Sequence, residues 1–261
     1  MRKNNEMRPI NVAYNIYSQA DSSVLFSLGK TQVLCAVTLQ QGVPKFLKGK
    51  GAGWLTAEYA LLPTATHERC ARENTLGNRD GRTIEVSRII GRTLRSCVDL
   101  SELGESTIII DCDVLCADGG TRVASINAAG LALWRAQEHW LSSGRIKKPF
   151  LFQRPVALAI GVTEEHVLLI DPDYKEDSAL IADFNIIGTQ SAVMEVQGGA
   201  ERRPLSWDLF MNVMQFGRDM LDMLGNDAHM HIPDRSDDIA IITEKYPLFS
   251  LKKRLASMSK E

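Results

Sequence analysis

One stretch near the middle of the chain constrains the fold more than any other part of the sequence. Residues 107–115 form an apolar, β-branched run with the pattern of a buried strand, and residues 125–140 have a helical pattern rich in small side chains. Asp118-Gly119-Gly120-Thr121-Arg122 connects the two. A glycine turn at the start of a helix can hold a phosphate, because its N–H groups approach an oxyanion and the helix end is partly positive. A tight turn without a ligand is the alternative that this stretch alone leaves open.

The overall composition narrows the class of protein. The chain has 261 residues, of which 44% are hydrophobic and 24% are charged, so it can bury a sizeable core. Its net charge of −2 excludes a globally basic nucleic-acid binder, and a nucleic-acid site must therefore rest on a local patch. The polar start predicts no signal peptide, no apolar run has membrane-spanning length, and the five cysteines lack zinc spacing. We therefore expect a cytoplasmic protein with reduced thiols.

Strand, hairpin and helix patterns recur in both halves of the chain. Strand patterns cover residues 12–17, 24–28, 31–39, 54–62, 107–115, 156–162, 167–171, 184–189 and 193–198, and helical patterns cover residues 83–100, 125–140 and 206–224. This order predicts an α+β fold with mixed sheets backed by helices. The remaining tail is polar, is interrupted by proline and holds one more strand candidate at residues 239–242. We expect residues 1–224 to form the main domain and residues 225–261 a C-terminal extension.

Seven arginines lie close together between positions 69 and 95: Arg69, Arg72, Arg79, Arg82, Arg88, Arg92 and Arg95. Arginine suits bidentate contacts to phosphate, so the cluster indicates anion binding in an otherwise neutral chain. Arg92 and Arg95 fall on a helix face, where pairing with nearby acidic residues is the better interpretation. The loop-like, glycine-containing segment before that helix is where we expect a functional role, and it holds Arg69, Arg72, Arg79 and Arg82.

A polar, acidic segment follows the strand pattern at residues 167–171. Within it, Asp177 and Asp183 could converge on one divalent cation, since Mg²⁺ is commonly bound by one or two carboxylates together with phosphate oxygens. An acidic surface turn is the simpler interpretation of this segment by itself. Together, however, the glycine turn, the arginines and the carboxylates suit a reaction in which one phosphate attacks another, because two anions repel each other in a partly dry site unless cations surround both.

Longer motifs resemble the RNase PH family along residues 11–224. They are Gly-Val-Pro-Lys-Phe at 42–46, Trp-Leu-Thr-Ala-Glu-Tyr at 54–59, Asp-Gly-Arg-Thr-Ile-Glu at 80–85, Asp-Cys-Asp-Val-Leu at 111–115, Asp-Gly-Gly-Thr-Arg-Val-Ala-Ser at 118–125, Glu-Asp-Ser at 176–178, Asp-Phe-Asn at 183–185 and Glu-Val-Gln-Gly at 195–198. The resemblance implies a ribosomal-protein-S5-domain-2-like βαβ fold and a ring hexamer built as a trimer of dimers. It also implies a phosphate-dependent 3′→5′ exoribonuclease, or tRNA nucleotidyltransferase, that acts on tRNA precursor 3′ ends.

The resemblance further implies roles for individual residues. Inorganic phosphate would attack the terminal phosphodiester and release a nucleoside diphosphate, and the reaction could run backwards to add nucleotides. The attacking phosphate would be held by Arg82, Gly120, Thr121 and Arg122. Asp177 and Asp183 would hold Mg²⁺ or handle protons. RNA would be bound by Arg69, Arg72 and Arg79.

The sequence also departs from the family pattern. Thr64 stands where the family usually has arginine after Pro63, residues 20–23 read Ala-Asp-Ser-Ser instead of Ala-Glu-Gly-Ser, and residues 200–203 read Ala-Glu-Arg-Arg where the family has Ala-Glu-Gly. These changes bear on RNA affinity and substrate range, while the phosphate site and the carboxylates stay in place. A non-catalytic RNA-binding ring subunit, and a hydrolytic metal-dependent nuclease that releases monophosphates, are the alternatives.

Overall fold

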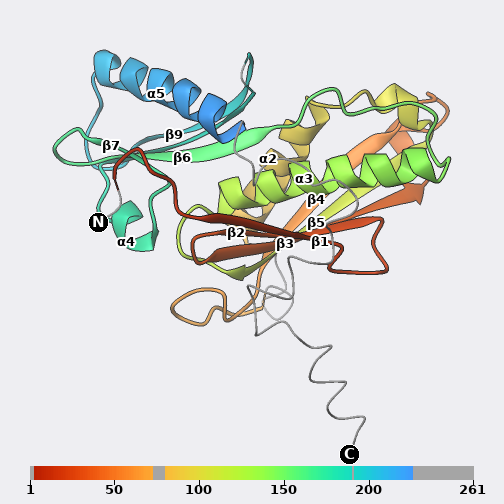
Figure 1. Ribbon diagram of the computed structural model, residues 1–261, viewed down its shortest axis with the longest axis horizontal. Coiled ribbons are helices and arrows are strands. Elements are labelled where there is room, and N and C mark those ends of the chain that lie inside the picture. Colours follow the sequence, from red (N-terminus) through yellow and green to blue (C-terminus); the bar gives the residue numbers. More distant parts are fainter. Residues whose placement is uncertain (1–2, 73–79, 190, 226–261) are drawn as a thin grey trace, which may run out of the picture.

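The computed structural model describes residues 3–72, 80–189 and 191–225, which form two β-sheets with helices packed on them (Figure 1). One sheet has the strand order β1-β2-β3-β5-β4 and the other the order β7-β6-β8-β9. The strands are β1 (Ile10–Tyr14), β2 (Ser22–Leu28), β3 (Thr31–Gln41), β4 (Trp54–Leu61), β5 (Ser106–Cys116), β6 (Val156–Val162), β7 (Leu168–Ile170), β8 (Ala182–Gly188) and β9 (Val193–Ala200). Neighbouring strands are antiparallel, except that β4 and β5 run parallel.

Strand β5 leads directly to the glycine turn. Its side chains alternate, so that Ile108, Ile110 and Val114 are buried while Asp111 and Asp113 on the opposite face are exposed. This pattern is typical of a strand with one face packed on a core. Because β5 is hydrogen-bonded to β3 on one side and to β4 on the other, the position of its carboxyl end is fixed.

The helices lie on one face of the first sheet and on the second sheet. They are α2 (Gly81–Arg95), α3 (Thr121–Ser142), α4 (Tyr174–Asp177) and α5 (Trp207–Gly225), and the short 3₁₀ helices are η1 (Lys45–Leu47) and η2 (Leu100–Leu103). Helix α3 packs on β2, β3 and β5 of the first sheet and also on β6 of the second, so both sheets share it. Helix α5 packs on β6 and β8, as Figure 1 shows in blue.

The small residues of α3 follow from its position between the two sheets. Every residue from 123 to 133 is buried, including the polar Asn127. The side chain of Asn127 donates to the carbonyl of Ala157 at 2.8 Å and accepts from the amide of Ala157 at 2.9 Å. A buried amide group is tolerated when it is hydrogen-bonded at both ends, and here it joins α3 to β6.

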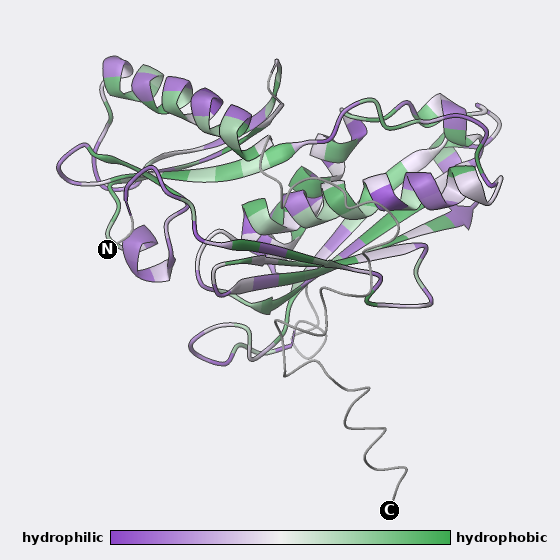
Figure 2. Ribbon diagram, in the orientation of Figure 1, coloured by the Kyte–Doolittle hydropathy of each residue, from purple (hydrophilic) through white to green (hydrophobic). Residues whose placement is uncertain are grey.

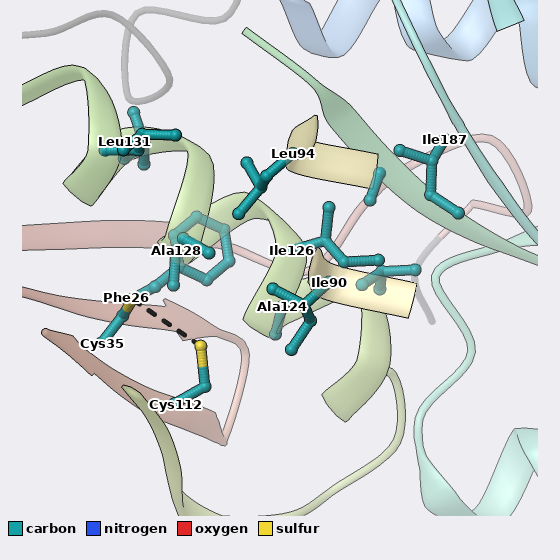
Figure 3. Close-up of a cluster of buried hydrophobic side chains, with 14 of the residues drawn as sticks. Phe26, Cys35, Ile90, Leu94, Cys112, Ala124, Ile126, Ala128, Leu131 and Ile187 are labelled. Carbon is teal, nitrogen blue, oxygen red and sulfur yellow. Dashed lines mark hydrogen bonds between the residues drawn. The ribbon is translucent and has the colours of Figure 1, made fainter. Parts of the chain in front are cut away.

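A continuous hydrophobic core connects the two halves. Phe26, Leu94, Ile126 and Ile187, contributed by both sheets and by α2 and α3, belong to one buried cluster (Figure 3). Figure 2 shows hydrophilic and hydrophobic residues alternating along α5, as expected of a helix with one face on a sheet. Within the core, the Sγ atoms of the facing Cys35 and Cys112 lie 3.6 Å apart, and both residues are free thiols.

The α+β architecture with mixed sheets backed by helices confirms the predicted fold class, and most elements begin and end close to the predicted residues. Helix α2 ends earlier than expected, because Val98 forms a bridge with Leu151 and Asp99 caps η2. The acidic segment contains α4, where the sequence suggested only a loop. Residues 226–261, including the strand candidate at 239–242, lie outside the described residues. Within the described ranges, no helix is long and apolar enough to cross a membrane.

Candidate active site

The glycine turn after β5 ends in an uncapped helix. Gly119 and Gly120 both adopt left-handed backbone conformations, with φ of +80° and +67°. Gly120 is the N-cap residue of α3, and no side chain caps the helix there. The first N–H groups of a helix have no partner within the helix and carry partial positive charge. The start of α3 therefore leaves amide groups available to an anion, and the phosphate-binding role of Gly120 and Thr121 stays a prediction.

The buried ion pair of Arg8 and Asp171 holds the glycine turn in place. Arg8 donates from its backbone N and from Nε to the same carboxylate oxygen of Asp171, each at 2.9 Å, and its Nη2 lies 2.5 Å from the other oxygen. The Nη1 group of Arg8 also donates to the carbonyl of Asp118. Thr31 Oγ1 donates to the carbonyl of Gly119 at 2.6 Å and accepts from the amide of Asp118 at 2.9 Å. No local sequence pattern marks Arg8 or Thr31, so neither residue is predicted from the sequence to belong to the site.

A cavity of about 940 Å³ opens over this turn. Its lining includes several residues that the sequence predicted for the site, together with two aromatic residues that the sequence did not predict. The predicted residues that line it are Arg82, Gly120, Thr121 and Asp177, and the two additional aromatic residues are His67 and Tyr174. Segments far apart in the sequence, from β4, α2, the start of α3 and α4, therefore meet at one site.

Arg82 lies in the first turn of α2 and reaches the start of α3. Its Nη2 donates to Thr121 Oγ1 at 3.3 Å, and the same oxygen lies 3.2 Å from the hydroxyl of Tyr59. Burial raises the pKa of Tyr59, so its hydroxyl stays protonated at neutral pH. A cation, a hydroxyl and the uncapped amides of α3 thus face the cavity together.

The side chain of Arg122 contacts an acidic residue of α2. Its Nη2 lies 3.1 Å from each carboxylate oxygen of Glu85. Its Nε is buried and, within the described part of the chain, has no hydrogen-bond partner. The positive charge of Arg122 nevertheless offsets part of the rise in pKa that burial causes at both Asp177 and Asp183, so Arg122 lies close enough to act on these carboxylates.

Asp177 and Asp183 lie at the end of α4 and in β8, close enough to influence each other. The pKa of Asp177 is raised by desolvation, and further by the negative charges of Asp183 and Glu201. Desolvation and Glu201 likewise raise the pKa of Asp183. Glu201, directly after β9, is a third carboxylate that the sequence analysis did not assign to the site. Mutual repulsion of this kind is relieved by a cation.

The carboxylates of Asp177 and Asp183 suit Mg²⁺ when phosphate oxygens of a substrate complete the set of ligands. Among the described residues, no group of three or more histidine, cysteine, aspartate or glutamate side chains could hold a metal ion by itself. Two carboxylates supplemented by phosphate oxygens and water are, however, the arrangement that Mg²⁺ commonly takes. Asp177 and Asp183 fit that arrangement in chemistry and charge.

The predicted RNA-binding arginines lie on the segment that follows β4. Arg69 and Arg72 are exposed there, beside the wall of the cavity formed by Cys70 and Ala71. Thr64 is exposed on the same segment. Arg79 lies outside the described residues. The segment therefore forms part of the cavity wall, and the RNA-binding role of its arginines stays a prediction.

Arg92 and Arg95 have structural partners, but these are not the nearby acidic residues that the sequence predicted. Arg92 Nη2 lies 2.5 Å from a carboxylate oxygen of Glu195. The guanidinium of Arg95 lies 4.8 Å from the ring centre of Trp54 and donates to the carbonyl of Leu55 at 3.0 Å. Both arginines thus join α2 to neighbouring strands, away from the glycine turn.

This fold, with an uncapped glycine turn beside paired carboxylates, defines a protein of the RNase PH class. The chain belongs to the 3′ exoribonuclease family, whose domain 1 matches residues 6–137.

Solved structures share the fold over most of the chain. Rice (Oryza sativa) Rrp46 is 19% identical with a TM-score of 0.68, and the match covers 84% of this chain and 92% of that one. The Archaeoglobus fulgidus exosome with RNA bound to its active site gives 23% identity and a TM-score of 0.69, covering 85% of this chain and 89% of that one. An archaeal exosome core gives 23% identity and a TM-score of 0.65, covering 85% and 87%. The resemblance to the RNase PH family is therefore confirmed.

Proposed function

We propose that this protein is a phosphate-dependent 3′→5′ exoribonuclease that shortens tRNA precursors and other RNA and releases nucleoside diphosphates. One observation carries the proposal: the uncapped start of α3, Arg82 and Asp177 face a single cavity. An anion site, a cation and a carboxylate around one space suit the attack of inorganic phosphate on a phosphodiester. Membership of the 3′ exoribonuclease family supports the same chemistry.

In the proposed reaction, inorganic phosphate binds to the amides of the glycine turn, to Thr121 and to Arg82. An oxygen of that phosphate attacks the terminal phosphodiester, the bond to the 3′ oxygen of the shortened RNA breaks, and that oxygen takes up a proton. Asp177 and Asp183 would hold Mg²⁺, which supplies positive charge against the two phosphates. In the alternative role for these residues, a carboxyl group with a raised pKa would instead deliver a proton to the leaving oxygen. The reverse reaction would add nucleotides.

We further propose that the RNA backbone lies along the exposed arginines Arg69 and Arg72, continued by Arg79, and that the protein assembles as a ring hexamer, a trimer of dimers. Exposed apolar side chains support assembly: on α5 and β9, Trp207, Met211 and Val193 are 80%, 60% and 66% exposed. The solved structures with this fold include exosome assemblies. Residues 1–224 would form the catalytic domain, and residues 225–261 an extension to it.

The test is to incubate the protein with a tRNA that carries extra 3′ nucleotides, with Mg²⁺, and to vary inorganic phosphate. Shortening that depends on phosphate and yields nucleoside diphosphates is expected. Nucleoside monophosphates without a phosphate requirement would mean hydrolysis, and bound but unshortened RNA would mean a non-catalytic binder.

Arg82→Ala separates phosphate binding from general damage. It removes a charge-assisted contact worth about 1.5–3 kcal/mol, so the KM for phosphate should rise roughly 10- to 140-fold. Arg88→Ala, on the exposed face of the same helix, is the matched control and should leave that KM unchanged.

A further inference from the structure

Two aromatic side chains meet at the wall of the cavity. The ring centres of His67 and Tyr174 lie 5.0 Å apart, and the ring planes make an angle of 47°. His67 comes from the segment after β4, and Tyr174 is the first residue of α4. Both side chains are exposed, with Tyr174 at 54%, and both line the same cavity as Arg82 and Thr121.

The backbones that carry these rings are both fixed against the glycine turn. On one side, the amide of Ala117 donates to the carbonyl of Ala65 at 2.8 Å, two residues before His67. On the other side, Gly119 packs so closely on residues 172–173 that a Cβ atom there would lie 2.6 Å from the carbonyl oxygen of Pro172.

A capping box then starts α4 directly before Tyr174. Asp173 accepts from the amide of Glu176 at 2.9 Å, and Glu176 accepts from the amide of Asp173 at 2.9 Å. The two rings are therefore held at a defined place beside the proposed phosphate position, rather than carried on free loops.

An exposed aromatic ring in such a place has a specific use in nucleic-acid binding. Each nucleobase has an apolar face that stacks on aromatic side chains, and single-stranded RNA is recognised largely in this way. The tilt between the rings leaves the pair open to a further planar group, and the neighbouring exposed arginines Arg69 and Arg72 suit the phosphates of the same strand.

We propose that Tyr174, supported by His67, forms the platform on which the 3′-terminal nucleobase of the RNA stacks. The inference rests on the proposed function, because it takes the attacking phosphate to lie at the glycine turn and the scissile bond beside it. The base next to that bond is the terminal one. Since stacking depends on the π face that all bases share, the platform tolerates every base and rejects an end that lacks one.

The test measures binding in the absence of phosphate, so that it does not depend on turnover. Fluorescence anisotropy gives the Kd of three labelled oligoribonucleotides: one intact, one abasic at the 3′ terminus and one abasic at the penultimate position. We expect terminal base removal to weaken binding to the wild-type protein roughly 5- to 140-fold, which corresponds to 1–3 kcal/mol per stacked base. Penultimate base removal should have a much smaller effect.

Substitutions test whether the weaker binding of RNA without its terminal base depends on the ring of Tyr174. Tyr174→Ala should bind the intact and the terminal abasic RNA equally weakly, Tyr174→Phe should keep the wild-type discrimination, and His67→Ala should reduce it. Phe152→Ala, which removes an aromatic side chain that is 64% exposed and does not line the cavity, is the matched control and should behave as wild type. Circular dichroism establishes that each variant is folded.

The possible outcomes distinguish failure of the stacking proposal from failure of the proposed exoribonuclease reaction. If the wild-type protein binds both ends equally, or discriminates at the penultimate base instead, the platform is overturned without recourse to any variant. If it discriminates at the terminus but releases no nucleoside diphosphate when phosphate is added, the platform stands and the proposed reaction fails. Diphosphate release with a Tyr174→Ala variant that still discriminates overturns the platform and leaves the reaction intact.

Discussion

At the scale of single residues, the buried pair of Arg8 and Asp171 is the contact on which the site most depends. The side chains are only 9% and 1% exposed, and they join two segments 163 positions apart. Burial by itself would lower the pKa of Arg8, but the hydrogen bond to Asp171 and nearby negative charges raise it above its ordinary value, so Arg8 stays charged. Removing one member of such a pair leaves an uncompensated charge in the interior.

Replacing Arg8 by methionine should therefore lower the free energy of unfolding by about 3–5 kcal/mol, measured by urea denaturation. Arg203→Met is the matched control, because its pair with Glu164 is exposed at 49% and 53%, and a surface pair contributes at most about 1 kcal/mol. Equal losses in the two variants would contradict the structural role assigned to Arg8.

The raised pKa values of Asp177 and Asp183 mean that these side chains lower the stability of the fold when they are ionised. A carboxylate whose pKa is raised in the folded state favours folding only while it is protonated, and this contribution is lost as the pH rises through the raised pKa. At neutral pH the two ionised carboxylates repel each other and Glu201.

Asp177→Asn should consequently abolish turnover and yet raise the Tm at neutral pH by about 1–2 °C. The difference in Tm should disappear below the ordinary aspartate pKa of 3.8, where the wild-type side chain is protonated as well. Added Mg²⁺ should raise the Tm of the wild type more than that of the variant. Scanning calorimetry across this pH range checks the sign, and a variant less stable at neutral pH would contradict it.

At the scale of elements, the sequence predicted those strands, helices and turns that a local residue pattern encodes. The strand before the turn, the helix after it and the glycine turn between them follow from alternation, small residues and glycines. Contacts between segments far apart in the sequence leave no local pattern. The hydrogen bonds from Arg8 and Thr31 to the glycine turn could therefore not be predicted. The pairing of Arg122 with Glu85 was missed for the same reason, because it depends on how two helices pack.

Helix α4 shows a signal that was present in the sequence and overlooked. Asp173 and Glu176 have the spacing of a capping box, but four helical residues are too few to produce a periodic pattern. The proximity of Tyr174 to His67, by contrast, depends on the close approach of α4 to the glycine turn, which only the folded chain reveals.

That close approach makes Gly119 a testable element contact. In Gly119→Ala the Cβ atom would meet the backbone of residues 172–173 and would also strain a left-handed backbone, so we expect a loss of about 2–5 kcal/mol in the free energy of unfolding. Gly144→Ala has a similar φ of +73° but no atom within 4 Å of the new Cβ, and should lose only about 1–2 kcal/mol. Urea denaturation of both variants measures the difference, and equal losses would exclude the steric contact.

At the scale of the whole molecule, helix α3 joins the two halves. It starts at the glycine turn, packs on both sheets and carries Asn127, whose side chain is hydrogen-bonded to β6. The carboxylates of the second half thereby reach the arginines and glycines of the first. An active site assembled from both sheets requires the whole described fold.

The proposed ring would cover exposed apolar residues of α5 and β9, and it predicts a mass larger than that of one chain. Light scattering coupled to size-exclusion chromatography should give about six times the mass of the chain. Because Trp207 is 80% exposed in the single chain, its fluorescence should shift to shorter wavelength if assembly covers α5. A monomeric mass at micromolar concentration would contradict the proposed ring.

The central claim is that the turn at Gly119 and Gly120, with Arg82, holds the phosphate that attacks the RNA. Radiolabelled inorganic phosphate tests it most directly, in a reaction with unlabelled RNA and Mg²⁺ followed by separation of the released nucleotides. The label should appear in the β-phosphate of nucleoside diphosphates with the wild-type protein and with Arg88→Ala, and should be strongly reduced with Arg82→Ala. Unlabelled nucleoside monophosphates, released at a rate independent of phosphate and of Arg82, would contradict it.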